Sequence, residues 1–318
     1  MQRPPTAHPE QAVHPSTLRQ AQGRLAQDER RVEGRIDLHL HTDHSDGTFT
    51  PGEVVRRART AGLSAISITD HDGIGGIAAA RQSAGNSAGA AEPLEILSGV
   101  ELTAVSHDRE LHVLGYGFRE DDPALNRHFQ SAQDRRQSRI QRMIERLNAA
   151  GVPVTQEEVR RIAGNVDSIG RPHLAEALVK RGAVGSLNEA FDRYLGDRAP
   201  CFVRSATLTV SDAVRLIRQA GGVAVLAHPY RLVEDEWLPE LVQEGIQGIE
   251  AFHSDHDAQT AQFYRRAAAE LGLLVTGGSD CHGFRKSKGP LIGTVEVPYD
   301  LLERLKEVIA SEAKQSRL

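Results

Sequence analysis

The stretch RIDLHLHTDHSDGTFTPGE, residues 35–53, places three histidines and three aspartates within ten consecutive positions. Its first half alternates, with apolar residues 36, 38 and 40 on one face and polar residues 37, 39 and 41 on the other, as in a β-strand. On such a strand His39 and His41 lie side by side, about 7 Å apart. Burying this cluster is unfavourable unless a partner such as a metal cation balances it. We therefore predict a strand that carries a metal site, followed by a helix that begins at the capping box of Thr50 and Glu53.

Six further strand-like runs follow, and each leads into or carries a polar side chain. The runs SAISIT, LEILSGV, GGVAVLA and LGLLVTGG lead into His71, Glu101, His228, and Asp280 with His282, while ELHVLGYG and GIQGIEAF carry His112 and Glu250. Helical patterns separate several of them, at 53–61, 74–83, 211–220, 234–244 and 258–271. This alternation predicts a parallel sheet closed into an α/β barrel, with the active site at the carboxyl ends of the strands.

Residues 119–204 lack a strand pattern and show helical spacing instead, with two further capping boxes, Thr155/Glu158 and Ser186/Glu189. We predict a helical insertion between the fourth and fifth strands. The barrel would then comprise residues 35–118 and 205–297. Residues 298–318 would form a C-terminal helix and tail, and residues 1–33, rich in Gln, Arg and Pro, a disordered tail.

Composition limits the broad class of protein. The chain has 318 residues, 39% of them hydrophobic, and a net charge of −5, which indicates neither nucleic-acid nor membrane binding as a global property. Its two cysteines make no disulfide framework, so we expect a cytoplasmic protein. No apolar run approaches the roughly 20 residues of a membrane span. The N-terminal stretch lacks the apolar core of a signal peptide, and no obligate protein partner is evident.

Nine polar residues at the strand ends make a candidate metal centre: His39, His41, Asp46, His71, Glu101, His112, His228, Asp280 and His282. Six imidazoles and three carboxylates suit Mn, Fe or Zn, and nine ligands would hold two or three divalent or trivalent ions. Taken singly, a histidine on an apolar strand or a Gly-rich loop such as GGSDCHG has an ordinary structural explanation. Their joint occurrence on one barrel favours metal. A multinuclear centre suits phosphate ester hydrolysis, because it activates water and clamps the oxygens of an in-line displacement.

These motifs also carry a family resemblance. DLHLHTDHSDG, ITDHDG, GVELTA, HVLGYG, AHP and GGSDCHG resemble, in order, the motifs of the PHP (polymerase and histidinol phosphatase) family, over residues 35–118 and about 205–295. The resemblance implies a distorted seven-stranded barrel that binds up to three metal ions, with the nine residues above as ligands. The insertion and GRPHLA, residues 170–175, are similar to one branch, which contains 3′,5′-nucleoside bisphosphate phosphatases and 5′–3′ exoribonucleases that trim short RNA.

The insertion supplies candidate substrate residues. Arg135 and Arg139 begin a row of four arginines at i, i+4, i+7 and i+11. This row is either a solvated face or a basic wall that receives a phosphate. Arg171 and His173 match the branch motif, so we predict that they bind a substrate phosphate. His253 follows a strand on the active face and stays open as ligand, phosphate contact or leaving-group acid.

The sequence thus predicts a metal-dependent phosphoesterase for a small phosphorylated nucleotide or short RNA, in which hydroxide attacks phosphorus in line and Asp46 and His253 are catalytic. Three alternatives stay open: a phosphatase of another small phosphomonoester resembling histidinol phosphate, an amidohydrolase-type metal hydrolase, and an inactive metal-binding module. Amidohydrolase-type barrels share the HxH motif but usually lack Glu101 and the terminal DxH. An inactive module usually lacks ligands, and here none is missing.

Overall fold

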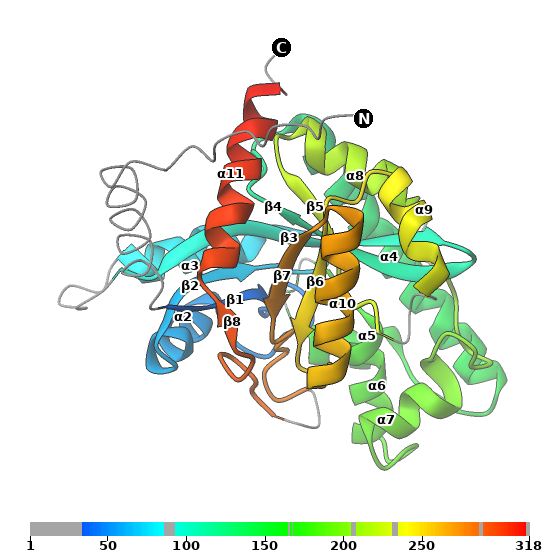
Figure 1. Cartoon of the computed structure of the whole chain (residues 1–318). Coiled ribbons are helices and arrows are strands. Elements are labelled where there is room, and N and C mark those ends of the chain that lie inside the picture. The colour runs from blue at the N-terminus through cyan, green and yellow to red at the C-terminus, as the bar shows by residue number, and fades with distance from the viewer. Residues whose placement is uncertain are drawn as a thin grey trace, which may run out of the picture. The chain divides into compact units, whose positions relative to one another are not determined.

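The computed structural model describes residues 34–85, 93–164, 166, 168–204, 208–230, 235–285 and 289–315. The predicted tail at residues 1–33 lies outside this range. The described strands form one eight-stranded sheet in the order β7-β6-β5-β4-β3-β2-β1-β8 (Figure 1). They are β1 (Arg35–Leu40), β2 (Leu63–Ile68), β3 (Glu95–Ser106), β4 (Arg109–Tyr116), β5 (Val223–Leu226), β6 (Gly248–His253), β7 (Leu274–Gly278) and β8 (Val297–Pro298).

The sheet curls until its two ends nearly meet, as the barrel prediction requires. Beyond β7, Cys281 forms a parallel bridge with Leu40 at the end of β1, and its carbonyl accepts a hydrogen bond from the backbone N–H of His41 at 3.1 Å. Gly278 packs so tightly on β1 that a Cβ there would lie 2.4 Å from the nitrogen of His39. Seven strands match the predicted runs. The eighth, β8, has only two residues, too few for alternation to reveal, and pairs antiparallel with β1.

One strand runs against the predicted direction. Strands β1, β2 and β3 are parallel, as are β5, β6 and β7, whereas β4 is antiparallel to both β3 and β5. The cause is the connection between β3 and β4, where His107 and Asp108 have φ of 48° and 59°. A two-residue turn with positive φ at both positions closes a hairpin and is too short for a crossover. Strand β3 consequently runs past Glu101, where we expected it to end, as far as Ser106.

Helices cover the barrel near the predicted positions: α2 (Pro51–Thr60), α3 (Gly75–Gly85), α8 (Val210–Gln219), α9 (Leu238–Gln243), α10 (Ala258–Leu271) and α11 (Asp300–Gln315). The capping box of Thr50 and Glu53 starts α2 as predicted. Helix α9 is shorter than its pattern, because its first turn, Asp235–Trp237, is a 3-10 helix. Within the part of the chain that the structure describes, no helix combines the length and apolar character that crossing a membrane requires.

Between β4 and β5 the chain is helical: α4 (Pro123–Ala149), α5 (Gln156–Ala163), α6 (Arg171–Lys180), α7 (Leu187–Ala190) and a π-helical turn, η2 (Phe191–Leu195). These helices enclose a hydrophobic cluster of their own, which includes Met143, Leu147, Leu174, Leu178 and Leu195. In Figure 1 α5, α6 and α7 lie to one side of the sheet. This arrangement brings side chains of α4 and α6 to the cavity described below.

Candidate metal centre and its cavity

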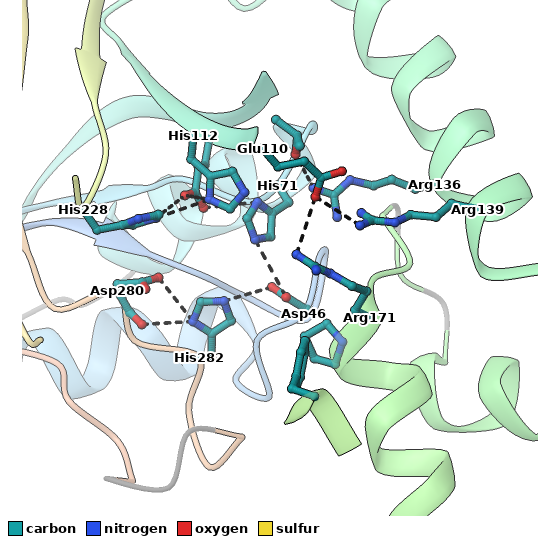
Figure 2. Close-up of a pocket in the computed structure, with 14 residues that line it drawn as sticks. Asp46, His71, Glu110, His112, Arg136, Arg139, Arg171, His228, Asp280 and His282 are labelled. Atoms are coloured by element: carbon teal, nitrogen blue, oxygen red, sulfur yellow. Dashed lines mark hydrogen bonds and ion pairs between the residues drawn. The ribbon is translucent and has the colours of Figure 1, made fainter. Parts of the chain in front are cut away.

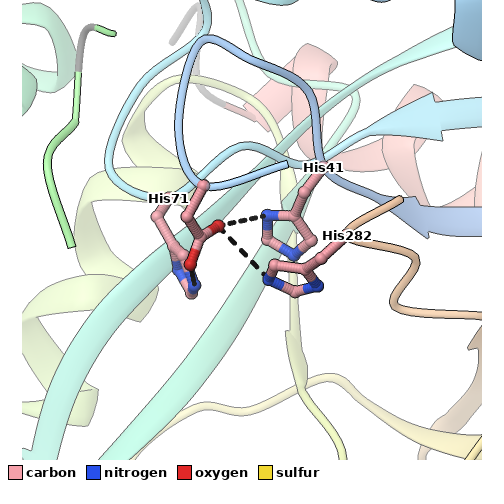
Figure 3. Close-up of side chains that lie close together, drawn as sticks. His41, His71 and His282 are labelled. Carbon is pink, nitrogen blue, oxygen red and sulfur yellow. Dashed lines mark ion pairs between the residues drawn. The ribbon is translucent and has the colours of Figure 1, made fainter. Parts of the chain in front are cut away.

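Asp46 lies in a loop that a buried carboxylate holds in place. Asp70, just after β2, accepts hydrogen bonds from the backbone N–H of Thr42 at 2.8 Å and from the hydroxyl of Ser45 at 2.5 Å. The Asp46 carboxylate faces three imidazoles, those labelled in Figure 3. Its oxygens lie 3.2 Å from Nε2 of His282, 3.7 Å from Nδ1 of His41 and 3.9 Å from Nε2 of His71. These four residues form one group of possible metal ligands.

Glu101 lies at the centre of a second set of contacts. Its Oε2 lies 3.1 Å from both Nε2 of His41 and Nδ1 of His71, and 3.4 Å from Nε2 of His39. Its Oε1 faces Nδ1 of His112 at 2.6 Å and Nε2 of His228 at 3.0 Å. Asp280 Oδ1 lies 3.1 Å from Nε2 of His41. Two further ligand groups overlap the first: His39, His41, Glu101 and Asp280; and His71, Glu101 and His112. His228 belongs to none of the three groups and joins them through its contact with Glu101. All nine predicted residues thus converge, and His112, which lies on the reversed strand, is among them.

The chemistry of the donor atoms fits bound cations. Several buried atoms in the described residues have no hydrogen-bond partner of acceptable geometry: Nε2 of His39, both ring nitrogens of His41, Oδ1 of Asp46, Nδ1 of His71 and Oε2 of Glu101. Unpaired polar atoms are unusual in protein interiors. Here they point at one another in mixed imidazole and carboxylate groups, a combination that suits divalent transition metals.

Buried carboxylates also fix the strand ends that carry these donors. Asp37 accepts hydrogen bonds from the backbone N–H groups of Ser279 at 2.8 Å and Gly293 at 3.1 Å, and burial raises its pKa to about 6 despite these bonds. His228 and Asp280 have φ of 22° and 51°. Backbone strain of this kind is typical of functional sites, where surrounding contacts enforce it.

A cavity of about 230 Å³ opens over the ligand groups, and three arginines share its lining with them (Figure 2). Arg136 donates from Nε to Asp72 at 2.6 Å and from Nη2 to the hydroxyl of Thr103 at 2.6 Å. Arg139 and Arg171 approach Glu110 Oε2 at 3.1 Å and 3.6 Å. We did not predict a role for Arg136. The available signal was that Arg136 falls in the apolar stripe of α4, a position at which an arginine is unexpected.

The other predicted substrate residues are placed differently. The structure does not bring Arg135 into the cavity, because its guanidinium bonds Ser131 on the same helix. Arg171 is the first residue of α6 and also pairs with Asp197 at 2.6 Å. His173 is buried, and its Nδ1 accepts a hydrogen bond from the backbone N–H of Gly170 at 3.0 Å, so it caps α6 rather than lining the cavity.

His253 lies behind the ligand groups. Its Nδ1 accepts a hydrogen bond from the backbone N–H of Asp255 at 3.1 Å, which leaves the ring proton on Nε2, 3.4 Å from Oδ2 of Asp280. It is buried and absent from the residues that line the cavity. This position favours a role in holding Asp280 over contact with a leaving group.

Comparison with known proteins agrees with this geometry. The PHP domain family model matches residues 37–179. The 3′,5′-nucleoside bisphosphate phosphatase of Chromobacterium violaceum is 34% identical over 252 residues, 78% of this chain and 87% of that protein. The 5′-3′ exoribonuclease of Haemophilus influenzae is 31% identical over 78% of this chain and 90% of its own length. The phosphoribosyl 1,2-cyclic phosphate 1,2-diphosphodiesterase of Eggerthella lenta is 33% identical over 78% and 94%.

A solved structure from Bifidobacterium adolescentis superposes with a TM-score of 0.77 at 31% identity, covering 86% of this chain and 96% of that one. The chain belongs to the PHP family of metal-dependent phosphoesterases. This confirms the predicted family and barrel fold, with the eighth strand as a small addition. The buried groups of histidines and carboxylates have the composition and spacing to hold divalent metal ions.

Proposed function

We propose that this protein hydrolyses phosphate esters of nucleotides, as a 3′,5′-nucleoside bisphosphate phosphatase, a 5′–3′ exoribonuclease on short RNA, or both. One observation carries the proposal: Arg136, Arg139 and Arg171 line the same cavity as the ligand groups. A substrate that bears two phosphates then meets a metal centre at one phosphate and guanidinium groups at the other. An uncharged amide substrate has no negative charge for these guanidinium groups to bind.

The nine predicted ligands would hold the metal ions; Glu101 belongs to two of the ligand groups and Asp46 to one. Bound divalent metals would lower the pKa of water and neutralise the charge that develops on the phosphoryl oxygens. In this proposal Asp46 stays a ligand, and His253 positions Asp280 through its Nε2. Glu250 positions His39, because its Oε1 lies 3.0 Å from Nδ1, the ring nitrogen that does not face Glu101 and Asp280.

The guanidinium groups of Arg139 and Arg171 would hold the second phosphate. Glu110 lies between them and offsets their mutual repulsion, so the two positive charges can sit together before substrate arrives. Burial, with a contribution from neighbouring Arg171, lowers the pKa of Arg139 to about 10, so the group stays protonated at neutral pH. Guanidinium groups bind phosphate oxygens in a bidentate manner, which a point charge does not reproduce.

A substrate panel tests the activity. Protein loaded with Mn²⁺ is assayed against 3′,5′-bisphosphoadenosine, a 5′-phosphorylated oligoribonucleotide, a ribosyl 1,2-cyclic phosphate and histidinol phosphate. We expect the highest kcat/KM on one of the first two. Preference for the cyclic phosphate or for histidinol phosphate would overturn the proposed substrate class while leaving the phosphoesterase assignment intact.

Two arginine variants test the substrate wall. Arg171→Ala should lower kcat/KM on the bisphosphate by a factor equivalent to about 2–3 kcal/mol, the scale of a lost hydrogen bond to a charged group. Arg171→Lys should recover only part of the lost kcat/KM. Metal content should not change. Arg135→Ala is the matched control, because Arg135 lies one residue from Arg136 but outside the cavity lining. Equal losses in Arg171→Ala and Arg135→Ala would show that nonspecific surface charge, and not this cavity, binds the phosphate.

A further inference from the structure

A second pocket, of about 550 Å³, adjoins the candidate metal centre. It shares three lining residues with the arginine-lined cavity: Pro172, Phe191 and His282. The remainder of its lining includes Leu187, Asn188 and Phe284. The two pockets therefore adjoin. The first is lined by three arginines, whereas the second combines the apolar side chains of Leu187, Phe191, Phe284 and Leu291 with the polar side chains of Ser186, Asn188, Ser254, Asp255 and Arg285. Its volume falls in the range of small-ligand sites, roughly 300–1,000 Å³.

Phe284 is the most exposed large hydrophobic residue in the described part of the chain, at 67%. Its ring is nevertheless held from behind. Phe49 packs edge-on against it, with ring centroids 5.3 Å apart, and the guanidinium of Arg57 lies 5.8 Å from the Phe284 ring and 4.0 Å from the Phe49 ring. The backbone N–H of Phe284 donates to the hydroxyl of Thr48 at 3.0 Å. An aromatic ring fixed in an exposed position has a free face available for a ligand.

The neighbouring residue couples this ring to the metal centre. Arg285 donates to the backbone carbonyl of Asp46 and, through Nη2, to Oε2 of Glu176 on α6 at 3.0 Å. The Arg285 side chain is 9% exposed and that of Glu176 29%, so these contacts are partly buried. The turn that carries Phe284 is thus fastened both to the Asp46 loop and to the helix that begins with Arg171.

We propose that this second pocket is the nucleobase subsite, in which the base of the substrate stacks on Phe284. The inference rests on the proposed function and deepens it. The occupant must be joined to a phosphate that reaches His282 and its neighbours, and it must present a flat face to Phe284. The nucleoside part of a nucleotide meets both conditions, because its sugar carries the phosphate and its base is flat. The exposed amide of Asn188 offers donors and an acceptor to the edge of a base. Because every base has a π-face, stacking predicts broad base tolerance.

Kinetics on matched substrates test the subsite. The substrates are 3′,5′-bisphosphoadenosine and abasic ribose 3,5-bisphosphate, which has the same phosphates and no base. Phe284→Ala should lower kcat/KM on the nucleotide by about 5- to 100-fold, the range of one lost base–aromatic stack, mainly through KM. The abasic compound should be affected less than twofold, and Phe284→Trp should retain activity. Phe263→Ala is the matched control, because Phe263 is 36% exposed on α10 and lines neither pocket.

A binding signal separates this inference from the proposed function. The fluorescence of 2-aminopurine riboside 3′,5′-bisphosphate is quenched by stacking, and we expect quenching with wild-type protein and with Phe263→Ala but not with Phe284→Ala. If wild-type protein hydrolyses neither bisphosphate under any metal, the proposed function fails. If it hydrolyses both equally, and Phe284→Ala changes neither turnover nor quenching, the phosphoesterase assignment stands and the nucleobase subsite is wrong.

Discussion

Glu250 and His39 form a buried pair, with Nδ1 of His39 3.0 Å from Oε1 of Glu250. Burial alone would raise the pKa of Glu250, but His39 and the neighbouring imidazoles lower it below its ordinary value, so the carboxylate is ionised. An ionised carboxylate accepts, which assigns the ring proton to Nδ1 of His39. Nε2 of His39 lies 3.4 Å from both Glu101 and Asp280. Burial lowers the pKa of His39, but the carboxylates around the ring raise it well above its usual range, so a bound metal ion would replace the proton on Nε2. A carboxylate behind a histidine is a common way to orient a metal ligand.

Replacing Glu250 with glutamine should weaken metal binding by about 10- to 100-fold. The carboxylate accepts from His39 and also from the backbone N–H of His228 at 2.8 Å, and an amide has only one acceptor atom for these two donors. Competition with a chelating dye measures the affinity. Glu270→Gln, on the exposed side of α10, is the control. Equal affinities in the two variants would show that Glu250 does not act on the metal site.

Chelation should lower the thermal stability of the protein and abolish phosphatase activity together. The buried atoms of His39, His41 and Glu101 that lack hydrogen-bond partners become uncompensated, and a ligand at 100 times its Kd stabilises the folded state by about 2.7 kcal/mol. Calorimetry with and without added Mn²⁺ gives the shift in Tm. Substituting alanine for His41, His71 or Glu101 should reduce this shift most, because each of these three residues belongs to two of the ligand groups. An unchanged Tm after verified metal removal would argue against a built metal centre.

Substitutions of Arg136 and Asp72 should have non-additive effects on the free energy of unfolding, whereas the effect on kcat/KM should come from the loss of Arg136 alone. Both are buried and lie 2.6 Å apart, so Arg136→Met leaves an uncompensated carboxylate and should cost about 3–5 kcal/mol. The double variant Arg136→Met/Asp72→Asn should regain much of that stability. If Arg136 binds substrate, kcat/KM stays low in the double variant. Recovery of both quantities would assign Arg136 a structural role only.

His173 should make stability fall on acidification. Burial, then Arg285, lower its pKa to about 4, against an unfolded value near 6.5. The folded protein then binds fewer protons than the unfolded chain between these pH values, so this contribution is complete above pH ~6.5 and is lost as pH falls toward 4. The loss can reach about 3 kcal/mol.

His173→Gln provides the comparison for this pH effect, because glutamine keeps an acceptor for the Gly170 N–H and does not titrate. Urea unfolding of both proteins, metal-free, at pH 7 and pH 4.5 gives the difference. If the free energy of unfolding differs between wild type and His173→Gln by the same amount at both pH values, the lowered pKa of His173 is contradicted.

The barrel and the nine residues that converge on the candidate metal centre were predictable from local patterns, and the family from the resemblance of the motifs. Alternation with period two identifies a strand and the face of each residue, and parallel strands in one barrel end at the same rim. Polar residues at those ends must therefore meet, whatever the details of packing. His112 reaches them as well, although its strand is reversed, because the hairpin pairs it with Thr103, two residues from Glu101 on β3, and its ring lies 2.6 Å from the Glu101 carboxylate.

Only the tertiary structure decided which face of a helix lies toward the candidate metal centre, because local spacing is compatible with more than one face. On α4, the row of Arg135, Arg139, Arg142 and Arg146 and the buried stripe through Arg136 both satisfy helical spacing. Only tertiary packing brings Arg136 and Arg139 to the cavity and leaves Arg135 outside it. Phe284 became notable only through its neighbours Phe49 and Arg57, more than 200 positions earlier in the chain. Helical and strand periods are local properties, whereas these contacts join segments that only the closed barrel and its helical insertion bring together.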